Sequence, residues 1–204
     1  DKDWKVRNEG LEALESLLAA NNNRILPNGL HDLVTLLKTR LNDNNKSQVK
    51  AFIVFLGKFA TALGSGVKNF SKILVPELVK NLSDKQNIIR SETLVTLGKF
   101  SAEIGAENVI NQLLPLLAVD NPELRTEVIN WVLSNADSLN KAEVRANINP
   151  VLSALQDKTK EIRLLAEKLL EKCIGCIGAQ PYLIALKDLK PAIQQSLKPI
   201  IEKC

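Results

Sequence analysis

Methionine is absent from the 204 residues, histidine occurs once, and there are only three cysteines. Three cysteines cannot form the disulfide framework of a small secreted domain, which favours a reducing compartment such as the cytosol. The sequence contains no secretory signal and no run of 18 apolar residues, so we expect no membrane span and no membrane partner. Because Met is missing and the chain begins at Asp1, we also expect a piece of a longer protein.

Aromatic residues are scarce, at 4%, although 45% of the chain is hydrophobic and 25% is charged. Aliphatic side chains must therefore build the core, which favours helices over a β-sandwich. The net charge of +4 makes an acidic partner plausible without requiring one.

Motifs for catalysis and cofactor binding are also missing, with no P-loop, GxGxxG or HExxH. His31 begins a helical stretch and has no obvious Ser or Cys nucleophile beside it, so we expect it to be solvated. Cys173 and Cys176 form a CxxC, but a helical stretch (EKLLEK) precedes them where a redox pair would need a strand. A zinc site would need four ligands, and only Cys204 and His31 remain, at remote positions. We favour small apolar residues on a helix face over the metal and redox alternatives, and predict no enzyme, cofactor or metal.

A repeat dominates what is present. LGKFATALG at 56–64 returns as LGKFSAEIG at 97–105, and LND at 41–43 returns as LSD at 82–84, each 41 residues later. Pairs of an apolar and a basic residue mark five units of about forty residues, and 181–204 is a candidate degenerate sixth. The pairs fall at 6–7, 49–50, 89–90, 124–125 and 162–163. A period of this length predicts stacked units.

Each unit reads as two helices joined by a short turn. Equivalent apolar stripes step by three, three and four residues, as a helix face does: Ile53, Leu56, Phe59 and Leu63, then Leu94, Leu97, Phe100 and Ile104. Gly64, Gly105 and Gly178 stand where such helices would end. Neither helix can bury its stripe alone, so the units must stack as an all-α solenoid.

For three further residues within the predicted helices, the sequence predicts the surroundings of the side-chain position. Gly57 and Gly98 lie inside the stripes, where close approach between layers is favoured over a hinge. Trp131 lies between Val128 and Val132 at helical spacing, and we expect it in the core.

An acidic residue occupies each turn, and an arginine usually follows it six residues later. This step joins Asp1 to Arg7, Asp84 to Arg90, and Asp157 to Arg163, and it is one residue shorter from Asp120 to Arg125. The carboxylate is expected to accept backbone N–H bonds and cap the second helix of its unit.

These residues resemble a known class. Pro76, Asp84 and Arg90, spaced by eight and six residues, resemble the signature of a HEAT repeat. DKDWKVRNEGLEAL, followed by LKTRLNDNNKSQV, is similar to the tubulin-binding TOG domains of the microtubule-polymerase family, and most similar to a fourth-position domain. The resemblance implies one TOG-like domain over 1–204, an elongated paddle of about six HEAT repeats excised from a longer multi-TOG protein.

The resemblance further implies binding of an αβ-tubulin dimer along the edge made by the turns within each repeat. It implies a monomeric cytoplasmic module of the cytoskeleton that contributes to polymerisation at microtubule plus ends, at the spindle and at the centrosome. The expected contact residues, which place lysine at four of five turns, are Trp4, Lys5, Asn44, Asn45, Lys46, Lys85, Gln86, Asn87, Asn121, Lys158, Thr159 and Lys160. The fourth turn lacks a lysine, and the carry-over is weakest there.

Alternatives remain at this point. Trp4 is either an exposed anchor, which the resemblance favours, or a lid folded onto Leu11 and Leu14. The chain could instead be a HEAT scaffold of the transport or phosphatase type with a non-tubulin partner. Nucleic-acid binding is disfavoured, because lysines are dispersed and the turns offer one aromatic residue where a stacking series would be needed.

Overall fold

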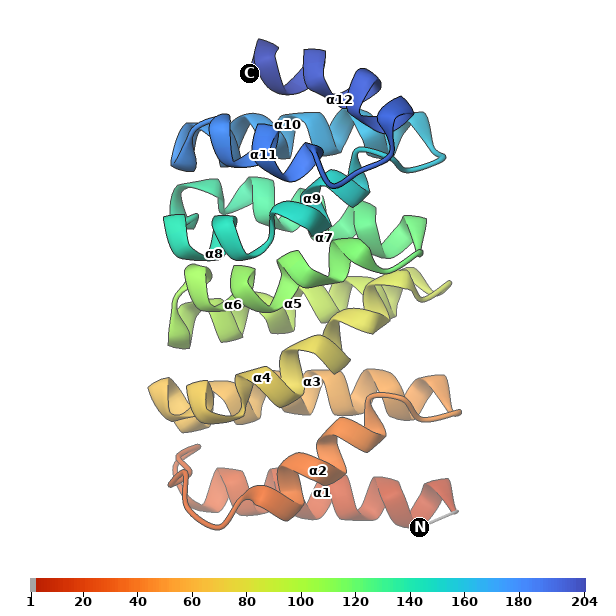
Figure 1. The fold of residues 1–204 in the computed structure, drawn as a ribbon. Helices are drawn as coiled ribbons and strands as arrows, with labels where there is room; N and C mark the ends of the chain where they lie inside the picture. The colour runs from red at the N-terminus through yellow and green to blue at the C-terminus, as the bar shows by residue number, and fades with distance from the viewer. Residues whose placement is uncertain (1–2) are drawn as a thin grey trace. The chain divides into compact units, whose positions relative to one another are not determined.

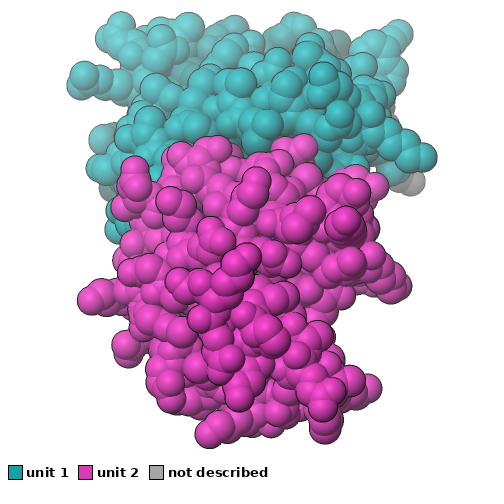
Figure 2. Space-filling view, turned by 90° about the horizontal axis from the view of Figure 1, so that it is seen from above, with its two compact units in different colours: residues 1–109 teal, residues 110–204 magenta. Residues whose placement is uncertain are grey.

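The computed structural model describes residues 3–204, and every regular element in that range is helical, as predicted (Figure 1). Asp1, the first acidic residue of the six-residue step, lies outside the described residues. The chain forms two compact units, residues 1–109 and residues 110–204, which Figure 2 colours separately. Each unit is described by itself.

The first unit contains pairs of helices whose directions alternate along the chain (Figure 1). Its long helices pack on one another in the order α1, α3, α5, and the contact between α3 and α5 is extensive. Helix α2 packs on α4. The elements are α1 (Trp4–Ala20), α2 (His31–Arg40), α3 (Lys46–Leu63), η1 (Gly64–Val67), α4 (Lys68–Val79), η2 (Lys80–Ser83) and α5 (Asn87–Ile104). Helix α6 (Ala106–Leu113) begins in this unit and ends in the next.

The second unit repeats the arrangement with shorter and more broken helices. Helix α7 packs on α10, α9 packs on η3, and α11 packs on α12. The elements are η3 (Leu114–Ala118), α7 (Pro122–Ser134), η4 (Ala136–Ser138), α8 (Lys141–Ala146), α9 (Ile148–Ala154), α10 (Lys160–Ile177), α11 (Gln180–Leu186) and α12 (Pro191–Lys203). The candidate sixth repeat at 181–204 thus corresponds largely to two helices, α11 and α12.

The predicted stripes lie on α3 and α5, which pack extensively on each other. All eight stripe residues are buried except Leu94, which is half-buried. Gly57 lies at the closest approach, because a Cβ atom there would come within 2.9 Å of Lys99 Cδ and 3.1 Å of Thr96 Oγ1. Close approach is wrong for Gly98, whose side-chain position is exposed with no atom within 4 Å. One residue beyond the buried Leu97, it has turned about 100° away from the stripe.

The long helices end at glycines, as predicted, whereas Trp131 does not lie in the core, as it was predicted to do. Gly64, Gly105 and Gly178 have φ values of +57°, +86° and +81°, and each follows the last residue of a long helix. Trp131 is half-buried on α7, because Val128 and Val132, one turn apart, form the fully buried stripe beside it.

One apolar segment departs from the sequence expectation about membranes. Lys46–Ser83, which runs from α3 to η2, is long and apolar enough to cross a membrane by length and composition. In the structure, 56% of its apolar window is buried against other helices. Helices α10 and α11 pass the same test only as a pair, and they bend by 120° at their junction.

Candidate functional site

The turns before the long helices share one hydrogen-bond geometry. An aspartate carboxylate accepts the backbone N–H two residues later, which folds an Asx-turn. These bonds are Asn45 N to Asp43 (2.9 Å), Gln86 N to Asp84 (2.9 Å) and Thr159 N to Asp157 (2.8 Å). The expectation that the aspartate caps the helix is therefore wrong. The N-cap is the residue whose N–H the aspartate accepts, two positions further along the chain.

Arginines at the six-residue step close two of these turns. Arg90 Nη1 donates to the carbonyl oxygens of Asp84 (2.7 Å) and Lys85 (3.2 Å). Arg163 repeats this with Asp157 (2.8 Å) and Lys158 (2.9 Å) in the second unit. The step seen in the sequence thus fixes the backbone on which Lys85 and Lys158 are presented.

Arg125, at the shorter step, has a different role. Its Nη1 donates to Asp157 Oδ2 over 2.5 Å, whereas Asp120 lies 3.9 Å away. Its Nε donates to the Leu117 carbonyl oxygen at 2.9 Å. Burial alone would raise the pKa of Asp157, but the hydrogen bonds from the Thr159 N–H and Arg125 hold that pKa below its usual range. This pair ties the turn before α10 to α7.

Trp4 occupies the first turn of α1 and lines a hollow of about 620 Å³ with Arg7, Thr39, Arg40 and the turn at 42–45. The side chain is 50% exposed, whereas Leu11 on the same helix is buried. Asp3 caps α1 by accepting the Lys5 N–H at 2.9 Å, which fixes the backbone at Trp4. The indole is therefore not enclosed in the core, as a lid would be.

Lys46 lies beside this hollow and is already paired. Its Nζ lies 2.6 Å from Asp84 Oδ2, although 49% of the lysine side chain stays exposed. Burial would raise the pKa of Asp84, but the hydrogen bonds from Lys46 and the Gln86 N–H hold the pKa below its usual range. A polar hollow of about 440 Å³ separates the two turns and is lined by both members of this pair and by Asn44.

Several predicted amides have structural partners. Asn45 Oδ1 accepts the backbone N–H of Ser47 at 3.0 Å, and Asn121 Oδ1 accepts that of Leu124 at 3.0 Å. Asn87 Oδ1 accepts from Arg90 Nη2 at 3.2 Å. Asn45 and Asn121 are thus helix caps, a role that accounts for an asparagine at these positions without any partner protein.

The remaining predicted residues lie on the turns or in the first turn of the helix that follows. Lys5, Asn44, Lys85, Gln86, Lys158 and Lys160 are exposed, and Thr159, the N-cap of α10, is half-buried. The first unit brings Trp4, Asn44 and Asn45 to one hollow, with Lys46 beside it. In the second unit, Asn121 and the stretch 158–160 precede α7 and α10, which the Arg125–Asp157 pair joins.

Sequence reasoning missed a charged cluster under Trp4. The Asp43 carboxylate accepts from Arg7 Nη2 at 3.3 Å and from Arg40 Nη1 at 3.3 Å. The sequence marked Arg7 and Asp43 separately, as parts of two repeat units. Their contact across 36 residues depends on how α1 meets the turn after α2, and no local pattern encodes it.

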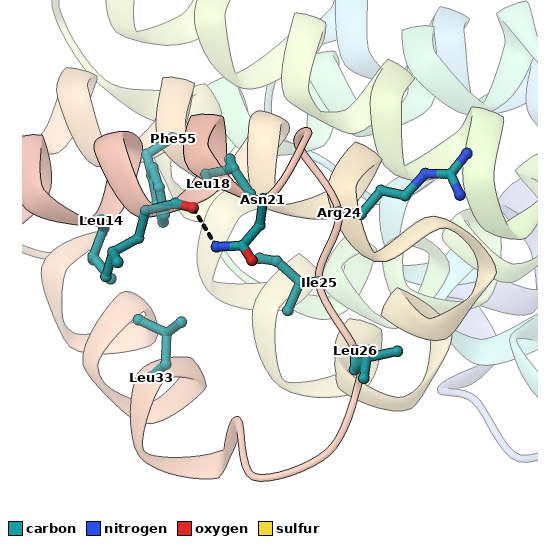
Figure 3. A pocket seen from close by; sticks show the side chains of 9 residues that line it. Leu14, Leu18, Asn21, Arg24, Ile25, Leu26, Leu33 and Phe55 are labelled. Carbon is teal, nitrogen blue, oxygen red and sulfur yellow. Dashed lines mark hydrogen bonds between the residues drawn. The ribbon is translucent and has the colours of Figure 1, made fainter.

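Sequence reasoning also missed an apolar hollow of about 350 Å³ at the other end of α1 (Figure 3). Leu14, Leu18, Leu33 and Phe55 line it, and Leu26 stands at its margin with 79% of its surface exposed. The sequence feature that could have indicated this hollow is the apolar pair Ile25-Leu26, which lies inside an otherwise polar loop, NNNRILPNG.

The cysteines and histidine behave as core and surface residues. Cys173 is buried, and burial raises the pKa of its thiol to about 11, while Cys176 is half-buried with Sγ 3.8 Å from the Leu139 carbonyl oxygen. His31 is exposed at the start of α2, as expected. Over residues 3–204, no three His, Cys, Asp or Glu side chains are grouped as a metal site would need.

Comparison with known proteins gives relatives of more than one kind, among them Transportin-1 of Homo sapiens, which is 26% identical over 144 residues, covering 71% of this chain and 15% of that protein. Centrosomal protein 224 of Dictyostelium discoideum is 28% identical over 209 residues, covering 100% of this chain and 10% of that protein. The chain thus spans about a tenth of the length of this relative.

Two solved structures share the fold. One, described as "Structural Basis of Microtubule Plus End Tracking by XMAP215, CLIP-170 and EB1", is 22% identical with a TM-score of 0.68, covering 100% of this chain and 86% of that one. Another, described as "TOG-tubulin binding specificity promotes microtubule dynamics and mitotic spindle formation", is 18% identical with a TM-score of 0.66, covering 89% and 76%.

A family model described as "XMAP215/Dis1/CLASP, TOG domain" matches residues 1–200, almost the whole chain. The resemblance in the DKDWKVR opening and the helical pairs seen in both units agree with that match. The chain belongs to the XMAP215/Dis1/CLASP family of TOG domains.

Proposed function

We propose that this chain is a tubulin-binding module that uses its turns to bind an αβ-tubulin dimer. The turns before α3 and α5 and the first turn of α1 would contribute Trp4, Lys5, Asn44, Lys46, Lys85 and Gln86. The turn before α10 and the first residue of that helix would contribute Lys158, Thr159 and Lys160. Asn45, Asn87 and Asn121 would support the turns, with direct contact as a secondary role.

The observation that carries the proposal is the half-exposed indole of Trp4 beside a hollow. Tryptophan is among the residue types most enriched at interface hot spots, so an exposed indole beside a hollow is a candidate anchor for a partner protein. A solved TOG domain with the same fold is described in terms of tubulin-binding specificity, which supports tubulin as that partner.

The charge of the turns supports the same partner chemistry. Lys5, Lys85, Lys158 and Lys160 are exposed, and each lies on or directly beside a turn. Exposed lysines raise the rate of encounter with an acidic protein surface through long-range attraction. We infer binding without catalysis, by a monomeric domain of the cytoskeleton that acts at microtubule ends, the spindle and the centrosome, in support of plus-end polymerisation.

Size exclusion of the chain with purified αβ-tubulin at low salt tests the proposal. We expect the chain to co-elute with tubulin, and we expect co-elution to weaken as salt rises. Separate elution at micromolar concentrations of both proteins would reject tubulin as the partner and favour a HEAT scaffold for another protein.

A further inference from the structure

We propose that Asp43 is a positioning residue that holds the Trp4 indole in the orientation in which it meets tubulin. The inference rests on the proposed function and deepens it, because it assigns the orientation of the anchor to a residue that need not touch tubulin. It also makes a claim about the free protein, which can be tested without tubulin.

The Asp43 carboxylate joins three parts of the chain. Arg7 on α1 donates from Nη2 to Oδ1 at 3.3 Å, and its Nε lies 3.1 Å from Oδ2. Arg40, in the last turn of α2, reaches Oδ2 at 3.3 Å, and the Asn45 N–H reaches Oδ1 at 2.9 Å. With its side chain only 5% exposed, Asp43 can donate little to an interface directly.

The contact from Arg7 to Asp43 lies at the end of α1 that carries Trp4. Residues three apart on a helix lie on one face, so Arg7 and Trp4 are neighbours one turn apart. Both line the same hollow as Asp43, Asn44 and Asn45. Holding Arg7 against the Asp43 carboxylate therefore restricts the rotation of the first turn of α1 relative to the turn at 43–45.

Asp84 in the next layer is held by a different kind of side chain. It occupies the equivalent turn position, and its Oδ2 lies 2.6 Å from Nζ of Lys46 on α3, an ammonium whose side chain is 49% exposed. The Arg7 side chain is 11% exposed, and its planar guanidinium has a more fixed direction than a lysine ammonium. The layer that carries the indole thus uses the more buried and more directional cation.

Holding an aromatic anchor in its bound orientation reduces the entropy lost on association. If Asp43 does this, replacing it should weaken tubulin binding through the indole alone. Asp43→Asn keeps the shape and the Asn45 bond but removes the charge that the two arginines share. We expect roughly three- to tenfold weaker binding, a part of the roughly thirtyfold carried by a hot-spot tryptophan.

A double-mutant cycle separates positioning from general stability. In a Trp4→Ala background, Asp43→Asn should change tubulin affinity by less than about twofold, because the group that it positions is gone. Asp84→Asn, the same substitution one layer away, is the matched control and should have the same effect with or without Trp4. An Asp43→Asn effect that is equally large in both backgrounds would overturn the proposal.

A second measurement uses the free protein. The chain has two tryptophans, so Trp131→Phe leaves Trp4 as the sole indole. In that background, Asp43→Asn and Arg7→Lys should lower the steady-state fluorescence anisotropy of Trp4 and speed its quenching by acrylamide. Arg40→Lys should do neither, because the Arg40–Asp43 pair joins residues three apart in the chain and is not the contact that links Asp43 to α1.

The two tests fail in different ways. If the wild-type chain does not bind tubulin, the proposed function fails, while the fluorescence result still decides whether Asp43 orders Trp4. If the wild type binds but Trp4 is equally ordered in Asp43→Asn and Arg7→Lys, positioning by Asp43 is wrong and tubulin binding stands.

Discussion

Arg125 donates to Asp157 over 2.5 Å, and the two side chains are only 7% and 2% exposed. A buried charge that loses its partner costs far more than the pair contributes, because water cannot replace the lost bond. We therefore expect Arg125→Ala to lower the free energy of unfolding by about 3–5 kcal/mol, measured by urea denaturation. The control is Lys58→Ala, which removes the exposed Lys58–Glu15 pair and should cost no more than about 1 kcal/mol. Equal losses in the two variants would contradict the assigned role of the buried pair.

Acid should destabilise the fold through the turn aspartates. Both Asp84 and Asp157 have a folded-state pKa below the usual value, so their contribution is complete above the ordinary pKa of about 3.9 and is lost as pH falls through the lowered folded values. Unfolding free energy measured between pH 7 and pH 2 should therefore fall mainly below about pH 4. Asp157→Asn should be less stable at pH 7 and lose less on acidification, and parallel curves for the two proteins would contradict this assignment.

Thiol reactivity distinguishes a structural Cys173 from a redox or metal site. Its burial and its raised pKa of about 11 leave almost no accessible thiolate at pH 8. Cys204 is exposed, although burial and nearby Glu171 raise the pKa of its thiol as well. In single-cysteine variants treated with a chromogenic disulfide reagent, Cys204 should react readily and Cys173 only after unfolding. Native Cys173 reacting as fast as Cys204 would reopen the redox interpretation.

Charge reversal tests the turn lysines. Lys85, Lys158 and Lys160 are exposed, whereas Lys46 pairs with Asp84 and is best left unchanged. Converting the three to Glu should slow association with tubulin, and the effect should shrink with salt, because exposed charges are screened beyond about 8 Å at physiological ionic strength. The matched control converts Lys72, Lys168 and Lys172, which lie on helices and carry the same total charge. Stopped-flow rates at low salt that fall equally in both variants would mean that net charge, and not the turns, governs encounter.

How far the sequence predicted this molecule depends on the distance over which each feature is encoded. The stripe from Ile53 to Leu63 and the C-terminal glycines follow from local periodicity and backbone preference, and the structure confirms them. Gly57 and Gly98 look equivalent in the repeat, yet only Gly57 meets another helix, because the rotation of each helix against its neighbours is a tertiary property.

For the candidate site, the sequence predicted where the residues lie better than it predicted what each side chain does. The resemblance placed residues on turns, and the structure has some of them there and others, such as Trp4, Lys46 and Lys160, in the first turn of the helix that follows. It did not show that Asn45 and Asn121 are helix caps, that Lys46 has Asp84 as its partner, or that Arg7 meets Asp43. The caps are local bonds of a kind that an N-cap signal indicates, whereas the two ion pairs join residues 36 and 38 apart, which a repeat pattern does not specify.

The most direct test of the account is Trp4→Ala, with tubulin affinity and melting temperature measured on the same preparation. Burying an indole removes roughly 150–250 Å² from water, and truncating a hot spot costs about 2 kcal/mol or more, so affinity should fall roughly thirtyfold. Melting should hardly change, because a surface substitution alters stability by about 0.5 kcal/mol or less. Trp131→Phe, in the second unit, should bind tubulin as the wild type does. A Trp4→Ala protein that melts several degrees lower and binds tubulin normally would show that Trp4 is structural and would contradict the central claim.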